Sequence, residues 1–105
     1  MLDLTVYKTR YYEIKIGENN IVHLETPKKK QLKVLLNLTK KVDSKNLTEE
    51  DMDALYEAAL IAFNKNKEGR TFTEEEIEEL LGLNALYDFF KGYYSWVADN
   101  VSQKN

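Results

Sequence analysis

Apolar residues alternate with polar residues at the start of the chain and recur at helical spacing further on. Even-numbered positions from Leu2 to Ile16 are mostly apolar, with Lys8 and Arg10 as interruptions. Alternation is the spacing of a half-buried strand. A turn composition at residues 17–20 and a second apolar run at residues 21–25 follow. The pattern predicts a β-hairpin over about residues 4–25, built from two strands or from three short ones.

The alternation also suggests a register for this hairpin. Pairing Ile16 with Val22 and Ile14 with Leu24 places the apolar side chains on one face. A slip of one residue would turn Val22 and Leu24 toward solvent. We therefore expect residues 18–20 to form a three-residue loop, with Asn20 in the left-handed conformation.

Four helices are predicted after the hairpin, over about residues 27–42, 48–65, 73–81 and 84–101. Each range shows apolar residues three or four positions apart. A hairpin followed by helices is the order of an α+β fold, here mostly α, and a chain of 105 residues is the size of one domain. The sequence therefore predicts a single domain over residues 1–105.

The predicted helices have recognisable start and stop signals. Thr26 followed by Pro27 favours the start of the first helix. Thr48 and Thr73 each precede an acidic first turn, the pattern of a capping box. Gly82 is typical of a helix end, and Asn84 can cap the last helix.

The last predicted helix is unusually aromatic. Six aromatic residues lie within ten positions: Tyr87, Phe89, Phe90, Tyr93, Tyr94 and Trp96. At about 100° per residue, the apolar arc covers roughly half of the helix, more than docking on one core requires. The helix is then either the centre of the core or partly a binding surface, since Tyr and Trp tolerate both burial and exposure. The candidate partner contacts are Tyr87, Phe90, Tyr94, Trp96 and Val97.

Charge is unevenly divided along the chain, whose net charge is −3. Up to residue 45 there are ten Lys and Arg against five Asp and Glu; from residue 46 on there are five against thirteen. A basic first half and an acidic second half favour docking within the chain or head-to-tail self-association. A homo-oligomer is therefore one expectation.

Composition bears on the cellular compartment in which the chain is expected. The chain has no Cys, so it has neither a disulfide framework nor a thiolate metal site. No run approaches the roughly 18 apolar residues of a membrane span, and the N-terminus lacks a basic-then-apolar signal. We expect a cytoplasmic protein without a membrane partner.

Catalytic chemistry is hard to find in this sequence. His23 is the sole histidine, and its place on the polar face of the hairpin favours a surface residue over a base or a ligand. The acidic groups at residues 49–53 and 74–79 are explained by the helix dipole. The lysine-rich face over residues 28–41 lacks Arg and aromatic partners, so it is better read as a solvated face than as a nucleic-acid site. We expect no enzyme, metal, cofactor or nucleic-acid partner.

The order of elements resembles a known family. Residues 22–29 (VHLETPKK) lead from a hairpin directly into a Leu-rich helix, Thr-Glu-Glu helix starts follow, and an aromatic helix ends the chain. This arrangement resembles the small tail assembly chaperones of long-tailed (siphovirus-type) bacteriophages and prophages of Gram-positive bacteria. The resemblance implies a role without catalysis: binding the tape measure protein while tail tube subunits assemble around it. It also implies the host cytoplasm as location and absence from the mature virion.

The resemblance adds one expectation about the gene. In many of these phages a −1 ribosomal frameshift near the end of the chaperone gene yields a longer product. The final residues Gln103, Lys104 and Asn105 can be encoded as CAA-AAA-AAC, which contains the slippery heptamer A-AAA-AAC. A frameshifted longer form is therefore a hypothesis for this chain.

Two other functions stay open at the level of sequence. A small acidic phage or bacterial inhibitor or regulator could use its acidic helices to imitate nucleic acid and bind a basic protein. A nucleic-acid-binding module could use the lysines of residues 28–41, although the acidic second half opposes it.

Overall fold

The computed structural model describes residues 1–2, 10–44 and 47–102. In these residues an antiparallel hairpin, β1 (Tyr12–Gly17) and β2 (Asn20–Leu24), is followed by helices. The helices are α1 (Lys29–Ser44), α2 (Glu49–Phe63), α3 (Glu74–Leu80) and α4 (Leu83–Ser102). The predicted α+β, mostly helical class is confirmed. The strand pattern at residues 4–9, the third strand it suggested and the end at residues 103–105 lie outside the described residues.

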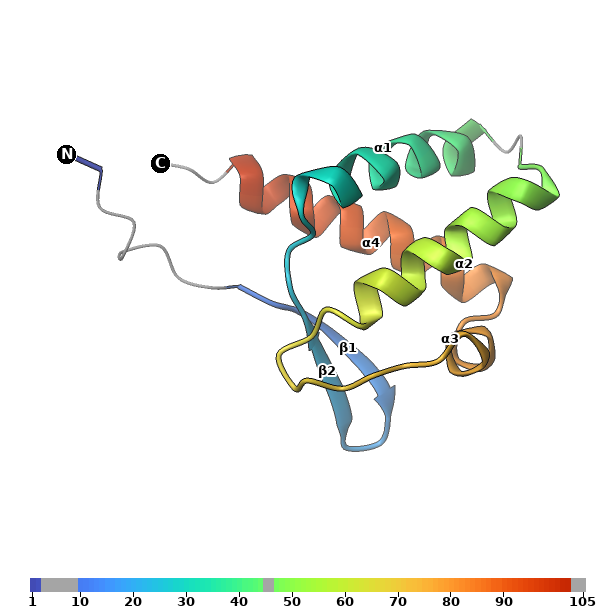
Figure 1. Ribbon diagram of the computed structural model, residues 1–105, viewed down its shortest axis with the longest axis horizontal. Coiled ribbons are helices and arrows are strands. Elements are labelled where there is room, and N and C mark those ends of the chain that lie inside the picture. Colours follow the sequence, from blue (N-terminus) through green and yellow to red (C-terminus); the bar gives the residue numbers. More distant parts are fainter. Residues whose placement is uncertain (3–9, 45–46, 103–105) are drawn as a thin grey trace.

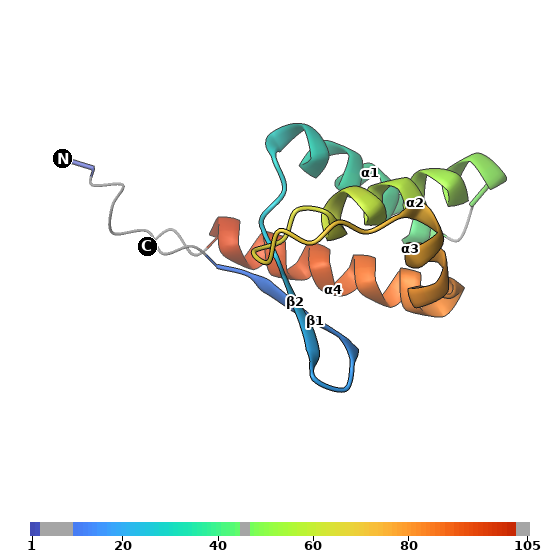
Figure 2. The ribbon, with the colours of Figure 1, turned by 60° about the horizontal axis from the view of Figure 1, so that its bottom comes forward.

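The helices form a group from which the hairpin projects. Figures 1 and 2 show the turn of the hairpin extending away from the helices, while α4 crosses beneath α1 and α2. Helix α4 contacts both α1 and α2, and α2 also contacts α1 and α3. The hairpin and the helices share one hydrophobic core, to which β2 contributes Val22 and Leu24.

The register of the hairpin differs from the expected one by two residues. Ile14 pairs with Val22 and Tyr12 with Leu24, so the turn is shorter and Asn19, not Asn20, has a positive φ of 131°. A shift of two residues leaves every side chain on its face, so alternation alone cannot distinguish the two registers. The observed register places Tyr12 against the aromatic residues of α4.

Helix α1 begins at Lys29, two residues after Pro27, so Thr26 does not cap it. The chain before α1 is held by the segment that follows α2. The Glu25 N–H donates to the Lys65 carbonyl over 2.9 Å, and Lys65 Nζ donates to the Thr26 carbonyl over 2.8 Å. These contacts keep the approach to α1 outside the helix.

Both predicted capping boxes are confirmed. The Thr48 hydroxyl accepts from the Asp51 N–H at the start of α2, and Thr73 accepts from the Glu76 N–H at the start of α3. Asp51 and Glu76 in turn accept from the backbone N–H of Thr48 and of Thr73. Each pair satisfies two N–H groups that a helix start otherwise leaves without partners.

The predicted bounds of α3 and α4 agree with the structure to within one residue, but Gly82 and Asn84 do not cap these helices as expected. Leu81 ends α3 in an extended conformation, and α4 begins at Leu83. Gly82 therefore belongs to the start of α4, where its carbonyl accepts from the Leu86 N–H over 2.9 Å, and Asn84 lies inside the first turn. The extended conformation accompanies burial of the Leu81 side chain and lets its carbonyl accept from the Tyr56 hydroxyl over 2.9 Å.

Helix α4 is the centre of the core. One face of it is buried, comprising Leu86, Phe89, Phe90, Tyr93 and Val97. Phe89 and Tyr93 are stacked with ring centroids 5.3 Å apart, and Phe63 of α2 packs on Phe89 at 5.2 Å. For these residues the interpretation of the aromatic helix as a core helix is correct.

Candidate partner-binding site

Two of the five predicted contact residues are removed from the surface by the fold. Phe90 is 1% exposed and Val97 is 3% exposed, because both lie on the buried face of α4. Both are core residues. Of the two, only Phe90 also lines the apolar groove described below, where it forms part of the buried floor.

The other three predicted contacts are half-buried and do not form one surface. The Tyr87 hydroxyl lies 4.0 Å from the sulfur of Met52, and Trp96 packs on Tyr12 with ring centroids 5.6 Å apart. Nine residues separate Tyr87 from Trp96, which at about 100° per residue places them on opposite sides of α4. Tyr94 lies on the same side as Tyr87. No single helix or strand can therefore cover all three.

An apolar groove lies between α1 and α2 in the described part of the chain. Figure 1 shows α1 and α2 diverging toward the start of α1 and the end of α2, with α4 behind them. The groove is open to solvent at its mouth. We call it the α1–α2 groove; its lining is Pro27, Gln31, Leu35, Ala58, Ile61, Ala62, Lys65, Phe90 and Tyr93.

The floor of the α1–α2 groove is buried and apolar. Phe90, Tyr93 and Leu35 are buried beneath it. The Tyr93 hydroxyl donates to the Glu25 carbonyl over 3.0 Å, and burial raises the pKa of this phenol above its usual range. The phenol therefore stays neutral, and the floor presents ring and methyl groups but no reactive group.

The walls of the groove hold its accessible apolar side chains. Ile61 of α2, one of the lining residues, is 40% exposed at the mouth. Ala58 and Ala62 are small, so α2 leaves room for a side chain between itself and α1. An apolar groove with an exposed branched side chain at its edge suits the apolar stripe of a helix.

Sequence reasoning missed this groove, although one signal pointed to it. The predicted contacts were all on α4, and only Phe90 among them lines the groove, on its buried floor. The accessible groove residues are on α1 and α2. Ile61 lies outside the apolar face that packs α2 on the core, where Leu55, Ala59 and Phe63 are buried. A large apolar residue on the solvent side of an otherwise amphipathic helix is the signal that could have found it.

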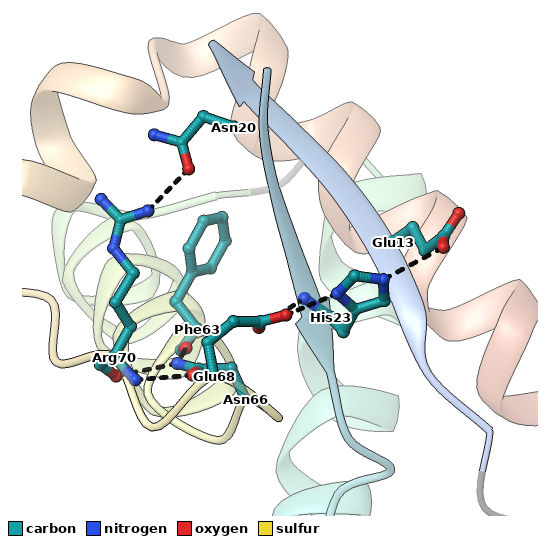
Figure 3. Close-up of polar contacts among 7 residues, drawn as sticks. All are labelled: Glu13, Asn20, His23, Phe63, Asn66, Glu68 and Arg70. Carbon is teal, nitrogen blue, oxygen red and sulfur yellow. Dashed lines mark hydrogen bonds and ion pairs between the residues drawn. The ribbon is translucent and has the colours of Figure 1, made fainter. Parts of the chain in front are cut away.

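A polar cluster attaches the hairpin to the segment that joins α2 to α3, residues 64–70. Figure 3 shows the His23 ring between two carboxylates: Nδ1 lies 2.6 Å from Glu68 Oε2 and Nε2 lies 3.2 Å from Glu13 Oε2. The His23 N–H also donates to Glu68 Oε1 over 3.0 Å. These hydrogen bonds lower the pKa of the Glu68 carboxyl, the backbone N–H of His23 being the largest cause.

The same segment is fixed from inside by Asn66. Its side chain donates to the carbonyls of Phe63 and Arg70 and accepts from the Arg70 N–H over 2.7–2.8 Å (Figure 3). Arg70 Nη1 then reaches Asn20 at the turn of the hairpin, 2.8 Å away. The cluster around His23 thus binds two parts of the chain to each other. Among the described residues no group of His, Cys, Asp or Glu is arranged to hold a metal ion.

The lysine face of α1 is exposed, and one of its members joins α1 to α2. Lys41 Nζ lies 2.6 Å from Asp51 Oδ1. The hydrogen bond from Lys41, followed by that from the Thr48 N–H, lowers the pKa of the Asp51 carboxyl. Lys28, Lys30 and Lys33 are exposed.

No family model, curated protein or solved structure matches this chain. The candidate site is therefore argued from the residues of this chain alone. None of the helices in the described ranges combines the length and the apolar character needed to cross a membrane.

Proposed function

We propose that this chain is a phage tail assembly chaperone that binds the tape measure protein in the host cytoplasm, without catalysis. Two observations support the proposal: the order of elements, hairpin, Leu-rich helix, two Thr-capped helices and aromatic helix, and the α1–α2 groove. The groove is the main support for the proposal, because this groove is apolar and has the exposed side chain of Ile61 at its mouth.

The expected occupant suits such a groove. A tape measure protein is a long helix with apolar stripes, and helices bind in grooves through apolar anchors spaced three or four residues apart. Covering these stripes keeps the long helix from aggregating until tail tube subunits surround it. The chaperone then leaves, so it is not expected in the mature virion.

Co-expression with the tape measure protein of the same genome tests the proposal. We expect the wild-type chain to keep the tape measure protein in the supernatant and to co-purify with it. Ile61→Glu places a charge at the apolar contact and should weaken binding at least about tenfold.

The hairpin offers a matched control for this variant. Ile21 is 48% exposed on β2, away from the groove, so Ile21→Glu makes the same change elsewhere and should leave binding intact. Circular dichroism of both variants checks that they fold. A tape measure protein that stays insoluble beside the wild-type chain contradicts the proposal, and equal binding by both variants removes the groove as its site.

An inhibitor or regulator of a basic protein is a second candidate, favoured by α3. All five of its glutamates are exposed: Glu74, Glu75, Glu76, Glu78 and Glu79. Such a surface attracts a basic partner through charge, and the attraction is screened by salt. Capture of a basic protein from a phage host, lost above roughly 0.3 M salt and unaffected by Ile61→Glu, would favour this candidate over the chaperone.

A further inference from the structure

The outer edge of β1 is open among the described residues, where β1 and β2 alone form the sheet. The His23 N–H donates to Glu68 Oε1, and the His23 carbonyl accepts from the Lys67 N–H, so both backbone groups of His23 point away from β1. Residues that face each other in an antiparallel ladder direct their backbone groups either toward each other or both outward. Glu13 faces His23, so the N–H and carbonyl of Glu13 point away from β2.

The same direction recurs two residues further along β1. Lys15 faces Ile21, and backbone direction repeats at every second residue of a strand, so the Lys15 groups also point away from β2. Within the described part of the chain, no backbone hydrogen bond from another segment reaches Glu13 or Lys15. Figures 1 and 2 show the turn end of the hairpin projecting from the helices. This edge therefore offers a short row of donors and acceptors to another strand.

The side chains of β1 are self-complementary about Ile14. Glu13 and Lys15, on either side of it, are exposed and have opposite charges, while Tyr12, Ile14 and Ile16 are half-buried on the other face. In an antiparallel pair of β1 strands with Ile14 on the twofold axis, each Glu13 faces a Lys15 and each Tyr12 faces an Ile16. Opposite charges and apolar pairs that face each other across two strands stabilise the pairing.

We propose that two copies of this chain associate through β1, whose strands pair antiparallel and join the two hairpins into one sheet. Glu13 of each copy exchanges both backbone hydrogen bonds with Lys15 of the other. Sliding one strand by two residues sets Glu13 against Glu13, or Lys15 against Lys15, and like charges in these positions repel. Charge thus selects one register and a second copy as the occupant. The surface goes beyond the proposed function and is separate from the α1–α2 groove.

Charge exchange across the strands tests the inference. Sedimentation equilibrium of the full chain measures its association, and for so short a strand we expect a weak dimer with Kd on the order of 100 µM. Lys15→Glu sets acidic side chains against each other and should weaken the dimer at least about tenfold. Glu13→Lys does the same with basic side chains and should have an equal effect.

Mixing these two variants gives the sharpest readout. One chain then carries acidic side chains at both positions and the other carries basic ones, so an equimolar mixture should dimerise at least as tightly as wild type. Lys33→Glu and Glu79→Lys make the same changes at exposed positions on α1 and α3. Each of these controls should dimerise like wild type, and circular dichroism checks that all four variants fold.

Amide hydrogen exchange locates the contact. The Glu13 and Lys15 amides should become protected as the wild-type concentration rises, because their N–H groups are taken up by the second copy. The Ile14 amide, which faces Val22 of β2, should be protected at every concentration and serves as the internal reference.

Three results would overturn the inference. The first is a wild-type chain that stays monomeric at about 1 mM, tenfold above the expected Kd. The second is a dimer that neither charge variant weakens, which places the contact elsewhere. The third is protection of the Glu13 and Lys15 amides at every concentration, which means that the edge is covered within a single chain. Ile61→Glu should leave the dimer intact, so failure of the groove and failure of the β1 edge are separate results.

Discussion

Tyr93 combines two roles in one side chain. Its ring forms part of the floor of the α1–α2 groove, and its hydroxyl donates to the Glu25 carbonyl just before α1. The hydrogen bond joins α4 to the strand that leaves the hairpin. Loss of the hydroxyl would keep the apolar packing but leave that carbonyl without this donor.

Tyr93→Phe should therefore lower the free energy of unfolding by about 1–2 kcal/mol. Urea denaturation followed by circular dichroism measures the change. Tyr94→Phe is the matched control, since its hydroxyl has no hydrogen bond among those of the described residues, and it should stay within about 0.5 kcal/mol of wild type. Equal effects of the two substitutions would show that the bond to Glu25 contributes nothing.

The His23 cluster makes stability depend on pH through Glu68. Because folding lowers the pKa of Glu68, its carboxylate stabilises the fold fully above the ordinary glutamate pKa, and this contribution is lost as pH falls through the lowered value. Urea midpoints measured from neutral pH down through about pH 4 should fall less steeply for Glu68→Gln than for wild type.

Glu18→Gln serves as the control for the acid series. Glu18 is an exposed glutamate in the turn of the hairpin, so its amide variant should follow the wild-type curve. If Glu68→Gln also follows that curve, the hydrogen bonds from His23 do not hold the carboxylate in the folded state.

Among the elements, the Thr-capped helix starts were the most predictable. A capping box involves residues three positions apart, so the sequence alone contains the whole motif, and both boxes form. Thr26 and Gly82 lie close to helix ends but do not act as caps, and long-range contacts accompany both: Lys65 holds the approach to α1, and Leu81, the C-cap of α3, is buried in an extended conformation.

This contrast gives a prediction for two threonines. Thr48→Ala removes a side chain that accepts the Asp51 N–H and should destabilise the fold by about 0.5–2 kcal/mol. Thr26→Ala, at a position that resembles a cap in the sequence but precedes the helix, should change stability by less than about 0.5 kcal/mol. Thermal or urea denaturation compares the two, and a larger effect at Thr26 would contradict the boundary at Lys29.

The packing of the whole molecule decides which apolar residues of α4 lie in the core and which lie at the surface, a question that the sequence left open. Half of α4 was recognised as apolar, but the choice between core and surface depends on which helices cover it. Helices α1 and α2 pack on α4 and bury Phe90, and the space between them becomes the groove. The spacing of apolar residues along the sequence does not predict the distance between two helices. The groove between α1 and α2 could therefore not be predicted from periodicity.

Docking of the hairpin on α4 is a contact of the same long-range kind. The Tyr12 hydroxyl lies over Gly92, at the place where a Cβ would stand, while its ring packs on Phe89, Tyr93 and Trp96. Only glycine leaves room there for the hydroxyl. A glycine inside α4 lowers the stability of the helix, but it allows the hairpin to approach the helix closely.

Gly92→Ala should destabilise the fold by about 1–2 kcal/mol, since the clash outweighs the gain of roughly 1 kcal/mol in helix propensity. In a Tyr12→Phe background the hydroxyl is gone, and the same substitution should become neutral or stabilising. A double-mutant cycle by urea denaturation measures this coupling. Additive effects would mean that Tyr12 and Gly92 do not meet in solution.

The segment after α2 also closes one edge of the hairpin. On the side of β2 away from β1, the Lys67 N–H donates to the His23 carbonyl, and Leu24 pairs with Asn66. An open strand edge is a template on which another extended chain can add, and it is a common route to aggregation. Here that edge is already occupied by the chain's own backbone. A foreign strand therefore cannot extend the hairpin at this edge of β2, because the backbone groups to which it would bond already have partners in residues 65–67.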